Sequence, residues 1–226
     1  QYLVNTNKQE EAGDVIAEMQ GHLTDEQEPL VMGMCYQMIG RGDDAEKAYL
    51  RAFKNQPQSL GVLRTLVTFY VQNRNRPMAI DYLDKMLALE DGQSGSDMNN
   101  IRWARRSKAQ MIAQSGNYQD LQRALALIDE NKANGSLPRS ELVQKATLLG
   151  GRPDYESRSE AISLLEELQF RLQGQGMELA PMEKHLLARL YEKDYKPDSW
   201  LKCREQMLEL IASVPPSQSQ VYKFDF

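Results

Sequence analysis

Two stretches of sequence decide the fold: PLVMGMCY at residues 29–36 and LRTLVTFY at residues 63–70. A shift of 34 residues aligns Tyr36 with Tyr70, and the same shift aligns Ala45 with Ala79 further along the chain. The apolar residues around both stretches follow the helical period. A helix–turn–helix unit that repeats at about this interval cannot bury its apolar face alone, so it stacks on its neighbours. The shift therefore predicts an all-α solenoid, a fold that supplies binding surface.

Composition limits the classes of function. The chain has 226 residues, of which 41% are hydrophobic, enough for a sizeable core. Its 27 Lys and Arg against 32 Asp and Glu give a net charge of −5, which argues against nucleic acid or an anionic membrane as a partner. No apolar run approaches the roughly 18 residues of a membrane span. The compartment stays unknown, with a soluble, cytoplasmic protein as the favoured expectation.

The first unit carries a motif on two successive helices. Met32, Gly33 and Tyr36 lie on the first helix; the second presents Ala45-x-x-x-Tyr49-x-x-Ala52, and Pro57 closes the unit. This pattern resembles the tetratricopeptide repeat. The resemblance implies a right-handed α-solenoid of antiparallel helix pairs, with small residues such as Gly33 at close helix crossings and large ones such as Tyr49 in the grooves between them.

The same motif, followed along the sequence, divides the whole chain into units. We predict a partial unit over 1–25, closely matching units over 26–59 and 60–97, looser units over 98–137 and 138–178, a further unit over 179–215, and a tail over 216–226. Neither end has the polar outer face that is typical of a terminal cap. We therefore expect the parent protein to continue past one or both ends.

Few residues suggest catalysis, a cofactor or a metal. The two histidines, His22 and His185, lie 163 residues apart, and units that touch only their neighbours cannot bring them together. Cys35 and Cys203 fit packing positions, where a buried cysteine behaves as a small apolar residue. No glycine-rich phosphate loop occurs. The sequence thus predicts a protein without catalysis, cofactor or metal of its own.

One helix carries a dense basic cluster with an aromatic residue inside it. Its members are Arg102, Trp103, Arg105, Arg106 and Lys108. The cluster fits a site for an acidic peptide or a phosphate, with Trp103 as a flat anchor. A solvated helix face, with Trp103 packed against the preceding unit, is the favoured interpretation, because charge runs on helices are usually solvated.

The resemblance also implies where a partner binds, because the family usually holds extended or helical peptides on its concave face. By alignment that groove is lined by Gln27, Leu30, Met34, Gln37, Arg64, Thr68, Val71, Trp103, Arg106, Gln110, Met182, His185 and Arg189. Members that grip a terminal carboxylate use a set of Lys, Arg and Asn on adjacent first helices. Leu30, Met34 and Thr68 stand where those polar residues would be needed, so we do not expect a clamp of that kind.

The leading hypothesis is a scaffold for protein–protein interaction whose partner is a protein or peptide of unknown identity. A structural or self-assembly segment, bound to other copies or to the rest of its own parent chain, is the first alternative. A regulatory arm of an enzyme domain elsewhere in the parent chain is the second.

Overall fold

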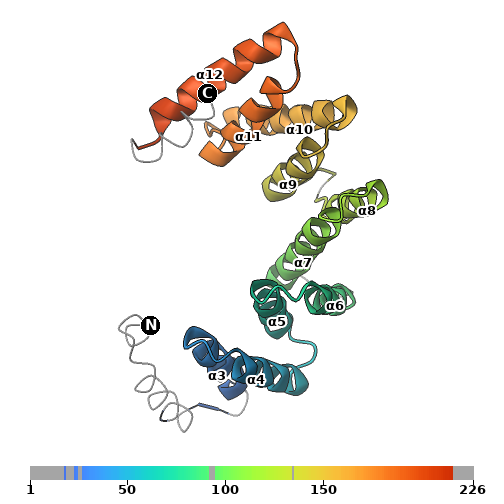
Figure 1. The fold of residues 1–226 in the computed structure, drawn as a ribbon, viewed down its shortest axis with the longest axis vertical. Coiled ribbons are helices and arrows are strands. Elements are labelled where there is room, and N and C mark those ends of the chain that lie inside the picture. Colours follow the sequence, from blue (N-terminus) through green and yellow to red (C-terminus); the bar gives the residue numbers. More distant parts are fainter. Residues whose placement is uncertain (1–17, 19–22, 25–26, 92–94, 134, 216–226) are drawn as a thin grey trace. The chain divides into compact units, whose positions relative to one another are not determined.

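The computed structural model describes residues 18, 23–24, 27–91, 95–133 and 135–215. Over these residues the chain forms ten helices and no β-strand, apart from an isolated bridge between Ala133 and Ser136. The all-α prediction is therefore confirmed (Figure 1). The predicted tail and nearly all of the predicted partial unit, including His22, lie outside the described residues.

The helices follow one another with short connections. In chain order they are α3 (Glu28–Met38), α4 (Gly42–Asn55), α5 (Leu60–Gln72), α6 (Arg76–Leu87), α7 (Gly95–Ala113), α8 (Tyr118–Asp129), α9 (Arg139–Gly150), α10 (Tyr155–Gln173), α11 (Pro181–Glu192) and α12 (Pro197–Ser213). None of the helices in the described ranges is both long enough and apolar enough to cross a membrane.

The chain divides into two compact units, residues 1–111 and 112–226, with the division inside α7. In the first unit α3 packs on α4, α5 packs on α6, and α4 contacts α5. In the second unit α9 packs on α10 and α11 packs on α12, while α8 contacts α9 and α10 contacts α11. Helices joined by short turns run antiparallel, so these are the helix pairs that the sequence predicts. The assignment of each unit boundary stays a prediction; α7, for example, begins at Gly95, before the predicted boundary between residues 97 and 98.

Both turns within the pairs of the first unit have the same backbone form. The amide of Arg41 donates to the carbonyl of Tyr36 at 2.9 Å, and 34 residues later the amide of Asn75 donates to that of Tyr70 at 2.8 Å. This bond closes the helix when the residue before it takes a left-handed conformation. Gly40 does so with φ 78°, and the equivalent residue in the next turn is Arg74, with φ 57°.

The core of the first unit lies between adjacent helices. A Cβ added to Gly33 of α3 would lie 2.4 Å from Cε1 of Tyr49 on α4, so the two helices cross as closely as the motif implies. The Tyr49 ring meets Phe69 of α5 edge-on, with ring centroids 5.3 Å apart. The other large side chains that are fully buried in this core include Leu63, Leu66, Tyr70, Leu83 and Met86.

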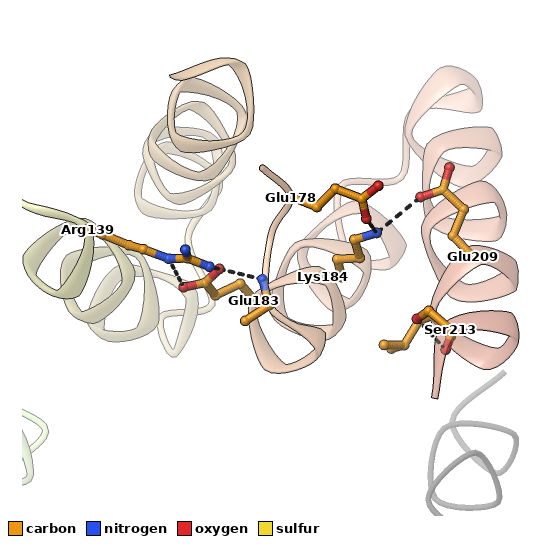
Figure 2. A network of polar contacts seen from close by, with 8 residues as sticks. Arg139, Glu178, Glu183, Lys184, Glu209 and Ser213 are labelled. Carbon is orange, nitrogen blue, oxygen red and sulfur yellow. Dashed lines mark hydrogen bonds and ion pairs between the residues drawn. The ribbon is translucent and has the colours of Figure 1, made fainter. Parts of the chain in front are cut away.

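The second unit is held by capped helices and by a polar link between first helices. Asn117 and Asp154 cap α8 and α10, accepting from the amides of Asp120 at 2.7 Å and Ser157 at 2.8 Å. Such caps satisfy amides that have no partner inside the helix. Arg139 of α9 reaches Glu183 of α11 through two hydrogen bonds, drawn in Figure 2. These contacts keep the ends of α9 and α11 together.

Candidate functional site

The structure places ten of the thirteen predicted groove residues in the first unit and three in the second. Within the first unit, the surface that carries most of them is formed by the first helices of successive pairs. We call it the first-helix face and define it as Met34, Gln37, Arg64, Thr68, Val71 and Trp103. A continuous groove through both units stays a prediction.

Gln37 joins two first helices across this face. Its Nε2 donates to Oε1 of Gln72, so a side chain of α3 is bound directly to one of α5. Its Oε1 accepts a hydrogen bond from the Tyr49 hydroxyl at 2.7 Å. Burial raises the pKa of Tyr49 to about 12, so the hydroxyl keeps the proton that it donates. The face therefore has a polar link between the C-terminal ends of α3 and α5.

Arg64 is held by the residues of the next first helix. Its guanidinium lies over the Trp103 ring, 4.6 Å from the centroid, and its Nη1 donates to Oδ1 of Asn100 at 3.0 Å. Trp103 itself is half-buried and packs against the core of the first unit. The aromatic residue of the basic cluster thus fixes an arginine of the preceding helix pair, which agrees with the favoured interpretation of Trp103.

Apolar side chains surround these polar contacts. Met34 is 44% exposed and Val71 is 47% exposed, whereas Met32, two residues before Met34, is fully buried. Met38, one turn after Met34, is also exposed, although it is not among the predicted groove residues. Its i, i+4 spacing from Met34 is the signal that could have identified it.

The remaining predicted residues of the first unit have different environments. Leu30 is half-buried and packs against the core, so it contributes little surface. Gln27 precedes α3 and Gln110 lies near the end of α7, and both are exposed. Arg106 is half-buried and makes contacts within the structure.

Two members of the basic cluster are committed to ion pairs. Arg105 is buried and paired with Glu90, which follows α6, and Lys108 is paired with Asp84 of α6. Because Glu90 and Asp84 neutralise these two cations, they do not form an open basic site. A sequence cannot show these pairs, because the partners lie 15 and 24 residues away.

The three residues of the second unit lie on α11. Met182 is 77% exposed, whereas His185 and Arg189 are half-buried. Nε of Arg189 lies 3.5 Å from a carboxylate oxygen of Glu192, one turn along the same helix. Along α11 an exposed apolar side chain is therefore followed by two half-buried polar ones, a mixture similar to that on the first-helix face.

The structure also places the two cysteines and the side chains that could bind a metal ion. Among the described residues, no three His, Cys, Asp or Glu side chains gather closely enough to hold a metal ion. Cys35 is buried beside Met32 and Ala48, and Cys203 is half-buried beside the core of the last helix pair. Burial raises the pKa of the Cys203 thiol, which keeps it protonated. Both cysteines lie at the packing positions that the sequence predicts.

Comparison with known proteins supports the same fold. No family model matches the chain, and no curated protein matches it. The structure is similar to the crystal structure of a tetratricopeptide repeat protein from Parabacteroides merdae ATCC 43184, at 16% sequence identity and a TM-score of 0.50. The match covers 97% of this chain and 81% of that one. The chain therefore has the helical-repeat fold of tetratricopeptide repeat proteins, and the resemblance that the motif indicates is confirmed at the level of the fold.

Proposed function

We propose that the chain is a non-catalytic scaffold that binds a segment of a partner protein on the first-helix face. The observation that carries the proposal is the exposure of Met34 and Val71 in this face, and of Met38 one turn after Met34, together with an arginine that is held over Trp103. Stacked helix pairs offer extended surfaces of this kind to their partners.

Two physical effects favour binding here. Covering exposed Met and Val side chains removes apolar surface from water, which is favourable at about 25 cal/mol per Å². Arg64 is held by both Trp103 and Asn100, so little of its conformational freedom remains to be lost when a partner binds. Trp and Arg are also the residue types that contribute most at protein interfaces. The bound segment is expected to place apolar side chains on the methionines and an acceptor group on Arg64.

The test uses peptides selected from a displayed random library against the whole chain. The chain has two tryptophans, so Trp200→Phe leaves Trp103 as the only one. We expect a selected peptide to change the emission of Trp103 in this variant, and to bind about tenfold more weakly to Val71→Glu, a loss of about 1.4 kcal/mol.

Leu50→Glu is the matched control, because Leu50 is an exposed apolar residue of the first unit that lies on the second helix α4. It is expected to leave the affinity unchanged. If Leu50→Glu weakens binding as much as Val71→Glu, or if the peptides leave Trp103 emission unaltered, the first-helix face is not the binding surface.

A further inference from the structure

The second unit contains a cleft that takes no part in the first-helix face. It lies between the second helices α10 and α12, with Tyr191 of α11 also lining it, and encloses about 340 Å³. That volume is at the small end of the range for ligand pockets, about 300–1,000 Å³, and is suited to one long side chain. All of its lining residues lie in the described part of the chain.

The one positively charged side chain of the cleft, Lys202, is neutralised by Glu166. Nζ of Lys202 donates to Oε1 of Glu166 at 2.7 Å, and the Tyr191 hydroxyl donates to the same oxygen at 2.7 Å. Burial alone would raise the pKa of Glu166, but the bonds from Lys202 and Tyr191 and the charge of Lys202 outweigh it and lower the pKa. Glu166 is therefore ionised at neutral pH and neutralises Lys202, the one cation among the lining residues.

Two acceptor groups that line the cleft have no hydrogen-bond partner in the described ranges. Glu205 of α12 is exposed and forms no ion pair or hydrogen bond within the described ranges. The next residue, Gln206, is buried, and its Oε1 has no hydrogen-bond partner there. A buried polar atom without a partner is costly, by about 1–3 kcal/mol, so a donor that enters the cleft is favoured.

An aromatic ring completes the site. Phe170 of α10 lines the cleft and is 78% exposed, the most exposed phenylalanine or tryptophan in the described ranges. The face of such a ring attracts a cation, and a flat guanidinium stacks on it. The cleft thus combines an exposed carboxylate and a buried amide oxygen, neither with a partner in the described ranges, with an exposed aromatic ring.

We propose that this cleft binds an arginine side chain of a partner protein. A guanidinium carries five N–H donors in one plane, so it can donate to Glu205 and Gln206 while it stacks on Phe170. Its charge complements the net negative charge left on the lining after Lys202 and Glu166 cancel, and it complements the acidic chain as a whole. The site is independent of the first-helix face, since the two surfaces share no residue.

The experiment titrates the ¹⁵N-labelled whole chain with N-acetyl-arginine N-methylamide and follows amide resonances by two-dimensional NMR. N-acetyl-citrulline N-methylamide is the matched probe, because it has nearly the same shape without the charge. We expect saturable shifts at Phe170, Glu205 and the side-chain amide of Gln206 with the arginine probe. Equal binding of the citrulline probe, or shifts confined to other residues, would overturn the proposal.

Variants separate the site from general attraction to an acidic protein. Glu205→Gln removes an exposed charge without disturbing the fold and is expected to weaken arginine binding about two- to fivefold, as for an exposed ion pair. Phe170→Ala is expected to weaken it as well. Asp198→Asn removes another exposed carboxylate of α12, which has no ion pair in the described ranges and lies outside the cleft; it is the control and is expected to leave binding unchanged. If Glu205→Gln and Asp198→Asn have equal effects, the probe responds only to net charge and the proposed site is contradicted.

Discussion

The turns within the helix pairs show how one backbone position affects stability. Gly40, Gly116 and Arg74 all have a positive φ in the turn that follows a first helix. An L-residue with a side chain is strained in this region, whereas glycine is not. Arg74 is exposed, and its side chain makes no hydrogen bond or ion pair in the described part of the chain, so nothing compensates the strain there.

Arg74→Gly is therefore expected to stabilise the chain by about 1 kcal/mol. The substitution relieves the backbone strain of the folded state, and the greater conformational freedom of glycine in the unfolded state offsets part of that gain. Urea unfolding followed by circular dichroism measures the change. Arg74→Ala, which keeps a Cβ at the same φ, is the control and is expected to bring no gain. A gain of equal size from alanine would show that loss of the arginine charge, not relief of strain, is responsible.

The close crossing of α3 and α4 gives a second residue-scale prediction. Gly33→Ala places a methyl group 2.4 Å from the Tyr49 ring, inside van der Waals contact, and Tyr49 is fixed by Gln37 and Phe69. Overpacking of this kind is expected to destabilise the chain by about 1–3 kcal/mol. Gly42→Ala, where the added methyl group meets open space at the start of α4, is the matched variant and is expected to be neutral or stabilising. Thermal unfolding of the two variants side by side decides the point.

At the scale of elements, adjacent helix pairs share a recurring polar contact. The Tyr70 hydroxyl on α5 donates to Glu46 of α4, and the Tyr191 hydroxyl on α11 donates to Glu166 of α10, both at 2.7 Å. Tyr191 follows Leu187 and Ala188 at the spacing with which Tyr36 follows Met32 and Gly33, so it has the same motif position as Tyr70. Both tyrosines bond back to the second helix of the preceding pair. Burial raises the pKa of both tyrosines, so each remains a donor at neutral pH. The motif tyrosine thus positions one pair on the next as well as filling the groove between them.

The link between α9 and α11 depends on pH. Burial would raise the pKa of Glu183, but the hydrogen bonds from Arg139 and from the Ala180 amide lower it below its ordinary value of 4.5. Because the folded chain holds this carboxylate ionised, its contribution is complete above that ordinary value and is lost as the pH falls through the lowered pKa. Figure 2 shows the residues involved.

Glu183→Gln is expected to cost about 1–3 kcal/mol at pH 7, because it removes the charge of a buried carboxylate that accepts two hydrogen bonds from Arg139. It is also expected to make the free energy of unfolding depend less on pH between 6 and 3. Urea unfolding at several pH values measures both effects. Glu167→Gln serves as the control, because Glu167 is an exposed carboxylate whose one partner in the described part of the chain is Arg171 of its own helix. A pH dependence identical to that of the native chain would contradict the assigned role of Glu183.

At the scale of the whole molecule, each helix pair is stabilised mainly by its neighbours in sequence. Stability in such a fold is close to a sum of terms for single pairs and for their interfaces. A local change is therefore expected to act locally.

Hydrogen exchange measured by mass spectrometry tests this expectation. In Gly33→Ala we expect faster exchange in α3 and α4 and unchanged exchange in α11 and α12, which belong to the other compact unit. Equal acceleration in all helices would mean that the chain unfolds as one cooperative body, contrary to the nearest-neighbour description.

The sequence by itself determined the helical class, the pairing of successive helices and the close crossing at Gly33. These features depend on periodicity and on residue size, which are local properties of the chain. The 34-residue shift even places Arg74 at the position of Gly40, although the sequence does not reveal its strained conformation.

Only the tertiary structure decided which surface side chains meet. In the folded chain Arg64 stacks on Trp103 and Arg105 pairs with Glu90. Leu30 packs against the core, and α10 and α12 form a cleft. The physical reason is that these contacts join residues 15 to 40 positions apart through side-chain rotamers and charges. The repeat pattern fixes which helices are neighbours but leaves open which of their polar groups find partners.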